Sequence, residues 1–210
     1  MKKLLLIFLI PFLSTPLLAE GFNDNYFQLG YSTSNYKFVD KIMDIKGSAE
    51  IGNSFSILGS YVRETGDWRD PGEYETSTYT TITIGIGKTF EVDTNTNITS
   101  SLSYLDYDLK QTRQADGSST ITNSSADTTA YIASLGVRNI SESGIESSIK
   151  FIRQGGGKSN SYSNELEIEI MKHFNETIAI GGRVLRRDNP PSSSHESDFT
   201  ETGIFVRRSF

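Results

Sequence analysis

Cysteine is absent from this chain of 210 residues, histidine occurs twice and tryptophan once. Without cysteine there is no disulfide framework and no thiolate metal site. The absence also suits a chain that is exported through an oxidising compartment, where free thiols would cross-link. His173 has no cluster of other ligand types around it in the sequence, so we expect neither a metal site nor a cofactor.

Long apolar runs are also missing, except at the start of the chain. Lys2 and Lys3 precede an apolar stretch over 4–13, and Leu17-Leu18-Ala19 stands before Glu20. This layout predicts a secretory signal peptide over 1–19 and a mature domain over 20–210. The stretch is too short for a membrane anchor, which needs about 20 apolar residues. Polar residues interrupt every later apolar stretch, so a membrane-spanning chain of this kind would have to use strands.

Positive charge is scarce relative to negative charge. The formal net charge is −6, and removing Lys2 and Lys3 makes it about −8 by the same side-chain count. An acidic chain argues against nucleic acid as a partner.

A period of two residues recurs through the rest of the sequence. Ile82, Ile84 and Ile86 alternate with small or polar residues, and Leu166, Ile168 and Ile170 alternate with glutamates. Alternate side chains of a strand point to opposite faces, so each segment has one apolar and one polar face. We find ten such segments, over 25–33, 38–51, 55–64, 78–90, 97–110, 127–139, 145–154, 163–174, 177–187 and 199–210.

The connections between these segments alternate between short and long. The short ones lie at 52–54, 91–96, 140–144 and 175–176, whereas longer polar ones cover 64–77, 111–126, 155–162 and 188–198. This asymmetry is typical of outer-membrane barrels, with short periplasmic turns and longer extracellular loops. The predicted fold is therefore all-β, a transmembrane antiparallel up-and-down β-barrel of ten strands, with eight strands as the alternative and both termini at the periplasmic end.

The main structural rival is a soluble β-sandwich, which would bury the apolar faces inside. Several strands here place charged residues on the inward face, as a membrane barrel does in its lumen. Unpaired charges in that number would be prohibitive in the core of a sandwich. Outward, lipid-facing positions are predicted for Phe55, Ile57, Tyr61, Ile82, Ile84, Ile86, Tyr131, Leu135 and Val137. The predicted lumen charges are Asp44, Lys46, Glu50, Glu146, Lys150, Glu165, Glu167, Glu169, Arg183, Arg187, Glu201 and Arg207.

The last segment favours the membrane interpretation. Thr202, Ile204, Val206 and Phe210 share one face, and the chain ends on Phe210. A terminal aromatic residue on an alternating strand resembles the signal that the outer-membrane barrel assembly machinery recognises. We therefore expect that machinery and the lipid of the outer membrane as partners.

Three further stretches carry a family resemblance. They are Gly47 to Phe55 with Leu58-Gly59-Ser60-Tyr61, then Ile84-Gly85-Ile86-Gly87, then Leu102-Ser103-Tyr104. They resemble the small outer-membrane β-barrel domain proteins of Gram-negative bacteria over most of the mature chain. The resemblance implies the fold and the cell outer membrane as location, but no reaction, because most members have no assigned activity. Lys88 and Lys172 depart from the pattern, at predicted periplasmic ends where a lysine can reach the headgroups.

The predicted function is non-enzymatic, either structural or in surface interaction, with a lumen filled by side chains. Ten strands only slightly exceed the eight-stranded size at which side chains fill a barrel, so a salt-bridged lumen is favoured over a pore. The alternative is a narrow porin-like channel, in which the same charges would line the pore. A ligand at the long loops is also possible, above all at 64–75, which combines Trp68 and Tyr74 with acidic residues.

A last alternative is a hydrolase at the rim of the barrel. Asp106 and Asp108, together with His195 and Asp198, are similar in type to the residues of the omptins, which are ten-stranded outer-membrane proteases. Such chemistry needs a water held between an acid and a base. This chain is much shorter, and its His precedes the acid, so the simpler interpretation is a polar strand end and a solvated loop.

Overall fold

A computed structural model describes residues 22–36, 39–70, 72–117, 120–156, 159–188 and 198–210. The expected signal peptide over 1–19 and the candidate His195 lie outside the described residues. Among the residues that are described, no helix is long and apolar enough to cross a membrane.

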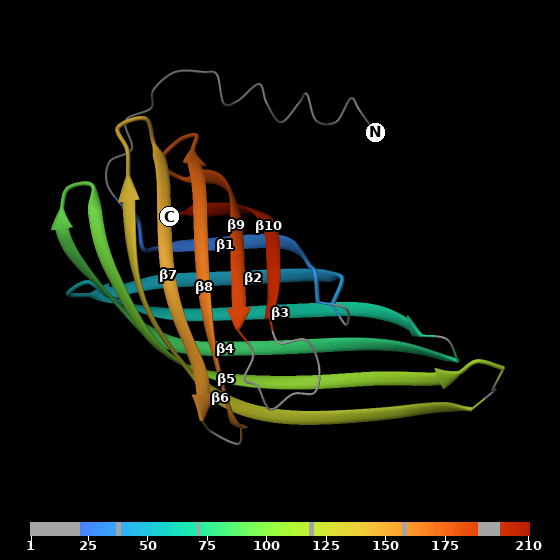
Figure 1. Ribbon diagram of the computed structural model, residues 1–210. Helices are drawn as coiled ribbons and strands as arrows, with labels where there is room; N and C mark the ends of the chain where they lie inside the picture. The colour runs from blue at the N-terminus through green and yellow to red at the C-terminus, as the bar shows by residue number, and fades with distance from the viewer. Residues whose placement is uncertain (1–21, 37–38, 71, 118–119, 157–158, 189–197) are drawn as a thin grey trace, which may run out of the picture.

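Ten antiparallel strands form one closed barrel (Figure 1). Each strand pairs with its neighbours in the sequence, and β1 closes the ring against β10. This confirms the ten-stranded up-and-down topology over the eight-stranded alternative. The strands are β1 (Tyr26–Ser34), β2 (Lys41–Gly52), β3 (Phe55–Asp70), β4 (Glu73–Asp93), β5 (Thr96–Ala115), β6 (Ile121–Ile140), β7 (Ile145–Gly156), β8 (Ser159–His173), β9 (Ile178–Asp188) and β10 (Asp198–Ser209).

The apolar residues of the alternating pattern face outward. All nine positions predicted to do so are exposed on the outer surface, among them Ile84 at 63%. A soluble protein would bury such residues, whereas in a membrane barrel they contact lipid.

Aromatic residues border the outward apolar surface at both ends of the barrel. Outward tyrosines mark one end at positions 31, 61, 104 and 131, and outward phenylalanines mark the other at 27, 55, 90 and 210. The two girdles match the aromatic belts of membrane proteins. Outward charges follow Tyr61 and Tyr104 by two positions, at Arg63 and Asp106, and we take them as the extracellular boundary of the apolar band.

The four connections that the sequence predicts to be short all lie at the phenylalanine end. The β2–β3 turn uses positive φ at Gly52, Asn53 and Ser54, and the β6–β7 turn uses it at Gly144. Asn and Gly tolerate that conformation best, so these residues allow the chain to reverse within a few positions. This end is therefore the periplasmic one, and both chain ends of the barrel lie there, at Tyr26 and Ser209.

Two of the predicted long loops are strands instead. β3 and β4 pair from Phe55↔Lys88 up to Asp70↔Glu73, and β5 and β6 pair as far as Gln114↔Ile121. The predictions of loops over 64–77 and 111–126 were therefore wrong. Beyond the apolar band neither face of a strand contacts lipid, so no apolar alternation marks these segments. Figure 1 shows β3 to β6 lying side by side and extending beyond the remaining strands; we call this part the projecting sheet.

Candidate functional site

A ladder of ion pairs runs along one wall of the lumen, and the strand register explains it. Lys150 of β7 lies directly opposite Glu167 of β8, and Glu165 and Glu169 of β8 lie opposite Arg187 and Arg183 of β9. Oppositely charged residues on neighbouring strands attract each other across the sheet. Lys150 Nζ lies 2.7 Å from Glu167 Oε1, and Arg187 Nε lies 2.5 Å from Glu165 Oε1.

Arg183 occupies the middle of the ladder and is almost fully buried. Its guanidinium lies 2.8 Å from Asp44 Oδ1 and 2.7 Å from Glu201 Oε1, and it donates a hydrogen bond to Ser32 Oγ. The Asp44 carboxylate fits only because residue 30 is glycine, since a Cβ there would lie 1.9 Å from Asp44 Oδ2. One cation therefore ties β1, β2, β9 and β10 together across the seam where the barrel closes.

Lys46 joins the two halves of the ladder. Its Nζ lies 3.2 Å from Glu167 Oε2 and 3.7 Å from Glu169 Oε1. Glu169 also lies 3.5 Å from Arg207, whose Nε donates to Gln28 Oε1 at 2.9 Å. These contacts join Lys150, Glu167, Lys46, Glu169 and Arg207 into one network, which lies beside the Arg183 cluster and the Arg187–Glu165 pair.

Glu146 lies at the periplasmic end of the ladder and contacts three basic side chains. Its carboxylate accepts contacts from His173 at 3.0 Å, Arg207 at 3.7 Å and Arg138 at 4.0 Å. No group of three or more His, Cys, Asp and Glu side chains among the described residues could hold a metal ion. His173 Nε2 is within hydrogen-bond distance of Glu146 Oε2, which fixes the position of its ring.

The segment 22–25, which precedes β1, crosses the periplasmic mouth; we call it the strap. Asp24 Oδ1 lies 2.7 Å from Arg138 Nη2 of β6, and Asp24 Oδ2 accepts a hydrogen bond from Thr89 of β4 at 2.7 Å. The Phe22 ring lies 4.8 Å from the Arg138 guanidinium. Because β6 stands five strands away from β1 in a ring of ten, the strap spans the lumen and narrows its periplasmic exit.

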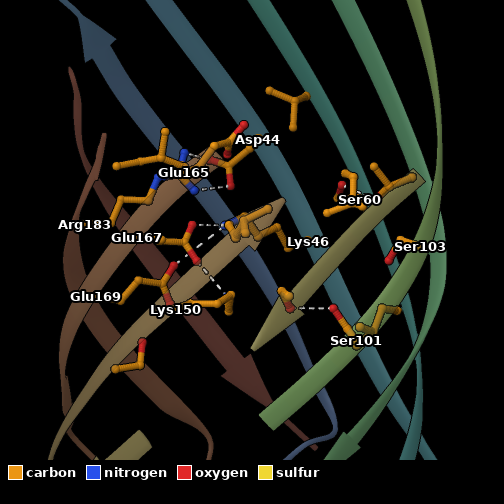
Figure 2. Close-up of a pocket in the computed structure, with 18 of the residues that line it drawn as sticks. Asp44, Lys46, Ser60, Ser101, Ser103, Lys150, Glu165, Glu167, Glu169 and Arg183 are labelled. Carbon is orange, nitrogen blue, oxygen red and sulfur yellow. Dashed lines mark hydrogen bonds and ion pairs between the residues drawn. The ribbon is translucent and has the colours of Figure 1, made fainter. Parts of the chain in front are cut away.

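The wall opposite the ladder carries small hydroxyl side chains instead of charges. Ser60 bonds Thr83 at 2.6 Å, and Ser101 bonds Ser134 at 2.6 Å. Figure 2 shows the labelled charged side chains gathered on one side and Ser60, Ser101 and Ser103 on the other. A cavity of about 510 Å³ lies between the two walls. The prediction of a lumen filled by side chains was therefore wrong for the side of the lumen next to the hydroxyl wall. Serine, threonine and glycine on that wall are too small to reach the ladder.

This cavity touches residues from one end of the barrel to the other. Its lining includes Tyr36 and Tyr79 at the extracellular side and Asp24 and Glu146 at the periplasmic side. Spread along the ~30 Å of a hydrocarbon core, 510 Å³ corresponds to a mean cross-section of roughly 17 Å². The space between the two walls is therefore narrow on average.

A cluster of aromatic residues surrounds the extracellular end of the cavity; we call it the vestibule. Tyr36 and Phe199 have ring centroids 5.4 Å apart, and Tyr79 and Tyr107 have centroids 5.8 Å apart. All four line the cavity, so aromatic side chains form its extracellular entrance.

One carboxylate faces this aromatic cluster. Glu64 of β3 lies opposite Tyr79 of β4 and also lines the cavity. Among the residues that the structure describes, no direct ion pair or hydrogen bond of the Glu64 side chain is found. The nearby Arg187 cation acts on Glu64 electrostatically while it pairs directly with Glu165.

The structure brings eleven of the twelve predicted lumen charges into the ladder. The exception is Glu50, which is on the lumen side by alternation but is exposed near the β2–β3 turn, where its backbone N–H donates to Asn25. Phe210 faces outward at 70% exposure, and its backbone N–H donates to Asn25 O. Its role as an assembly signal stays a prediction.

Of the residues of the hydrolase hypothesis, the structure describes the side chains of Asp106 and Asp108. Asp106 points outward and is exposed, and Asp108 lies 3.5 Å from Lys110, with about half of its side chain exposed. His195 and the Asp198 side chain lie outside what the structure describes. In the 64–75 segment, Glu75 is buried and accepts hydrogen bonds from Gln111 and Arg113, so it is part of a paired sheet rather than a loop surface.

Sequence reasoning missed the strap and the vestibule. Arg138 and Glu64 follow outward residues by one position, so strict continuation of the alternation would have placed both in the lumen. Asp24 and Tyr36 lie outside the strands, where no periodicity applies. Only the three-dimensional structure could reveal their contacts.

No family model matches the chain, and no curated protein matches its sequence. Solved structures do match its fold. The NanC porin is 9% identical with a TM-score of 0.54, covering 88% of this chain and all of the porin. The transport unit of the autotransporter AIDA-I from Escherichia coli is 12% identical with a TM-score of 0.50, covering 99% of this chain and 97% of that unit.

The chain has the fold of the Gram-negative outer-membrane β-barrel proteins. At such low identity the likeness concerns the fold alone. The function has to be argued from the lumen itself.

Proposed function

We propose that this protein is a narrow, non-enzymatic channel of the outer membrane for small solutes. The observation that carries the proposal is the single cavity that touches both ends of the lumen, between the ladder and the hydroxyl wall. The outward apolar band and its two aromatic girdles support the location in a membrane. The fold shared with a porin is compatible with this function.

The ladder has a structural part in such a channel. Glu167, Glu169 and Arg183 are buried, whereas Lys46, Lys150 and Arg187 keep 25%, 32% and 27% of their side chains exposed. Buried charges of both signs hold the wall rigid, and the partly exposed cations meet the solute. Mutual pairing offsets part of the cost of burying these charges.

The test is the ionic conductance of refolded protein in a planar bilayer. Steps far smaller than those of sixteen-stranded porins are expected, because the diameter grows with the strand number. The variant Ser101→Phe places a large ring in the cavity and should reduce the step size. Leu102→Phe, one residue further along β5 and on the lipid face, should leave it unchanged.

Two results would contradict the proposal. One is a folded wild-type barrel that shows no conductance. The other is an equal response of the step size to the lumen variant and to the lipid-face variant.

A second candidate function is attachment to a partner outside the cell through the projecting sheet. The supporting observation is that β3 to β6 have 16, 21, 20 and 20 residues, against 9 to 15 in the other six strands. Shortening both hairpins to the height of β2 should abolish attachment and leave the barrel folded. Unchanged adhesion of cells carrying the shortened protein would exclude this candidate.

A further inference from the structure

We infer that the vestibule binds a small organic cation, such as a methylated ammonium ion. The inference deepens the proposed function, because this site would select the solute at the channel entrance. Four aromatic rings and one unpaired carboxylate meet there, at the extracellular end of the cavity.

The aromatic rings supply the first part of the recognition. The face of an aromatic ring carries partial negative charge and attracts a cation within about 6 Å of its centroid. Phe199 already makes this contact with Arg187, whose guanidinium carbon lies 4.7 Å from the ring centroid. Tyr36 packs against Phe199, and Tyr79 against Tyr107. The vestibule therefore presents further aromatic surface of the kind that one cation already uses.

Glu64 supplies the second part. The Arg187 guanidinium pairs with Glu165 at 2.5 Å, so its charge is largely neutralised. Glu64 adds a second carboxyl group near the Arg187 cation, which acts on it electrostatically without a direct ion pair. When Glu64 is ionised, Glu64, Glu165 and Arg187 together carry a net charge of −1, which favours a cationic guest over an anionic one.

The surroundings of the site add selectivity for an organic ion over a metal ion. Val39, Ile42, Leu105 and Leu185 border the cavity at this level and are buried. Apolar side chains cannot replace the water ligands of a strongly hydrated metal ion. They pack favourably against the methyl or methylene groups of an organic ammonium ion. An uncharged sugar could stack on the same rings, but it would leave the Glu64 charge uncompensated.

The experiment measures binding of tetramethylammonium to the refolded full-length barrel by calorimetry and by NMR. Tert-butanol, similar in size and uncharged, is the comparison ligand. We expect saturable binding of the ammonium and none of the alcohol at equal concentration. Glu64→Gln should weaken ammonium binding about tenfold, because the carboxylate is the only unpaired charge in the site. Tyr107→Leu should weaken it severalfold.

Asp106→Asn is the matched control. It removes a carboxylate one residue from Tyr107 but on the outward face, so binding should change less than twofold. Heat-modifiable migration on gels checks that each variant is folded. The inference is overturned if wild-type protein binds the alcohol as well as the ammonium, if it shows no saturable ammonium binding, or if Glu64→Gln and Asp106→Asn have equal effects.

Conductance separates this inference from the proposed function. Ammonium binding without any conductance would refute the channel and keep the site, because the site needs only an open vestibule. Conductance without ammonium binding would refute the site and keep the channel. Block of the current by tetramethylammonium, lost in Glu64→Gln, would support both together.

Discussion

Arg183 contributes more contacts to the lumen than its neighbours, because it pairs with two carboxylates and a hydroxyl at once. Its partners come from strands on both sides of the β1–β10 seam. A buried cation of this kind is hard to replace, since its removal leaves Asp44 and Glu201 facing each other without compensation.

Arg183→Met should therefore destabilise the barrel by about 3–5 kcal/mol, the range for breaking a buried ion pair on one side. The measurement is the urea midpoint of the refolded barrel in lipid vesicles. Arg186→Met provides the comparison, because Arg186 lies on the outward face of the same strand and its side chain is 63% exposed. If the urea midpoint of the Arg186 variant shifts as much as that of the Arg183 variant, the buried contacts of Arg183 do not stabilise the barrel more than an exposed side chain does.

Strands could be predicted from the sequence only where one of their faces contacts lipid. Where a strand crosses the apolar band, its two faces differ, and the alternation located every strand and most of its inward charges. Above the band, neither face of β3 to β6 contacts lipid, so Thr76, Glu75 and their neighbours show no apolar alternation. Their pairing arises from the register already set within the membrane, which simply continues upward. The strap gave no signal either, because four irregular residues have no period.

The outward orientation of β4 makes Ile84 a sensitive position. Ile84→Arg should cost ~2–4 kcal/mol of insertion free energy, because a basic side chain then lies near the bilayer midplane. The readout is the yield of heat-modifiable barrel after refolding into vesicles. Ile121→Arg introduces the same residue at an exposed position on the projecting part of β6, and it should refold as the wild type does. Equal yields from the two variants would contradict the assigned depth of Ile84.

The strap should limit the current through the channel. Asp24→Ala removes its bonds to Arg138 and Thr89, so the segment should leave the periplasmic mouth and the single-channel step should grow. Recordings in planar bilayers measure the change. Glu50→Ala removes an exposed carboxylate from the same end of the barrel and should leave the step unaltered. A smaller or unchanged step in Asp24→Ala would show that the strap does not obstruct the exit.

For the whole molecule, the balance of charge in the lumen determines which ions pass. Eight acidic side chains line the cavity against six basic ones, apart from Lys88, whose ammonium lies over the outward Phe55 ring. The acidic set is Asp24, Asp44, Glu64, Glu146, Glu165, Glu167, Glu169 and Glu201, and the basic set is Lys46, Arg138, Lys150, Arg183, Arg187 and Arg207. The excess of two negative charges attracts cations into the narrow space.

Potassium should accordingly permeate better than chloride, and the reversal potential across a KCl gradient gives the ratio directly. Glu64→Lys changes the balance by two charges at the entrance and should move the reversal potential toward chloride. Asp108→Lys makes the same change outside the lumen and serves as the control. Preference of the wild-type channel for chloride would mean that the partly exposed Lys46, Lys150 and Arg187 outweigh the net charge.

The strap also has a consequence for the order of events during biogenesis. Asp24 is among the earliest residues of the barrel domain to be synthesised, yet Thr89 lies 65 residues and Arg138 lies 114 residues further along the chain. Neither partner is in place until β4 and β6 have joined the growing sheet. The strap can therefore narrow the periplasmic exit only after β4 and β6 have joined the sheet. This narrowing is a late step of assembly, and it indicates that the middle of the barrel is complete.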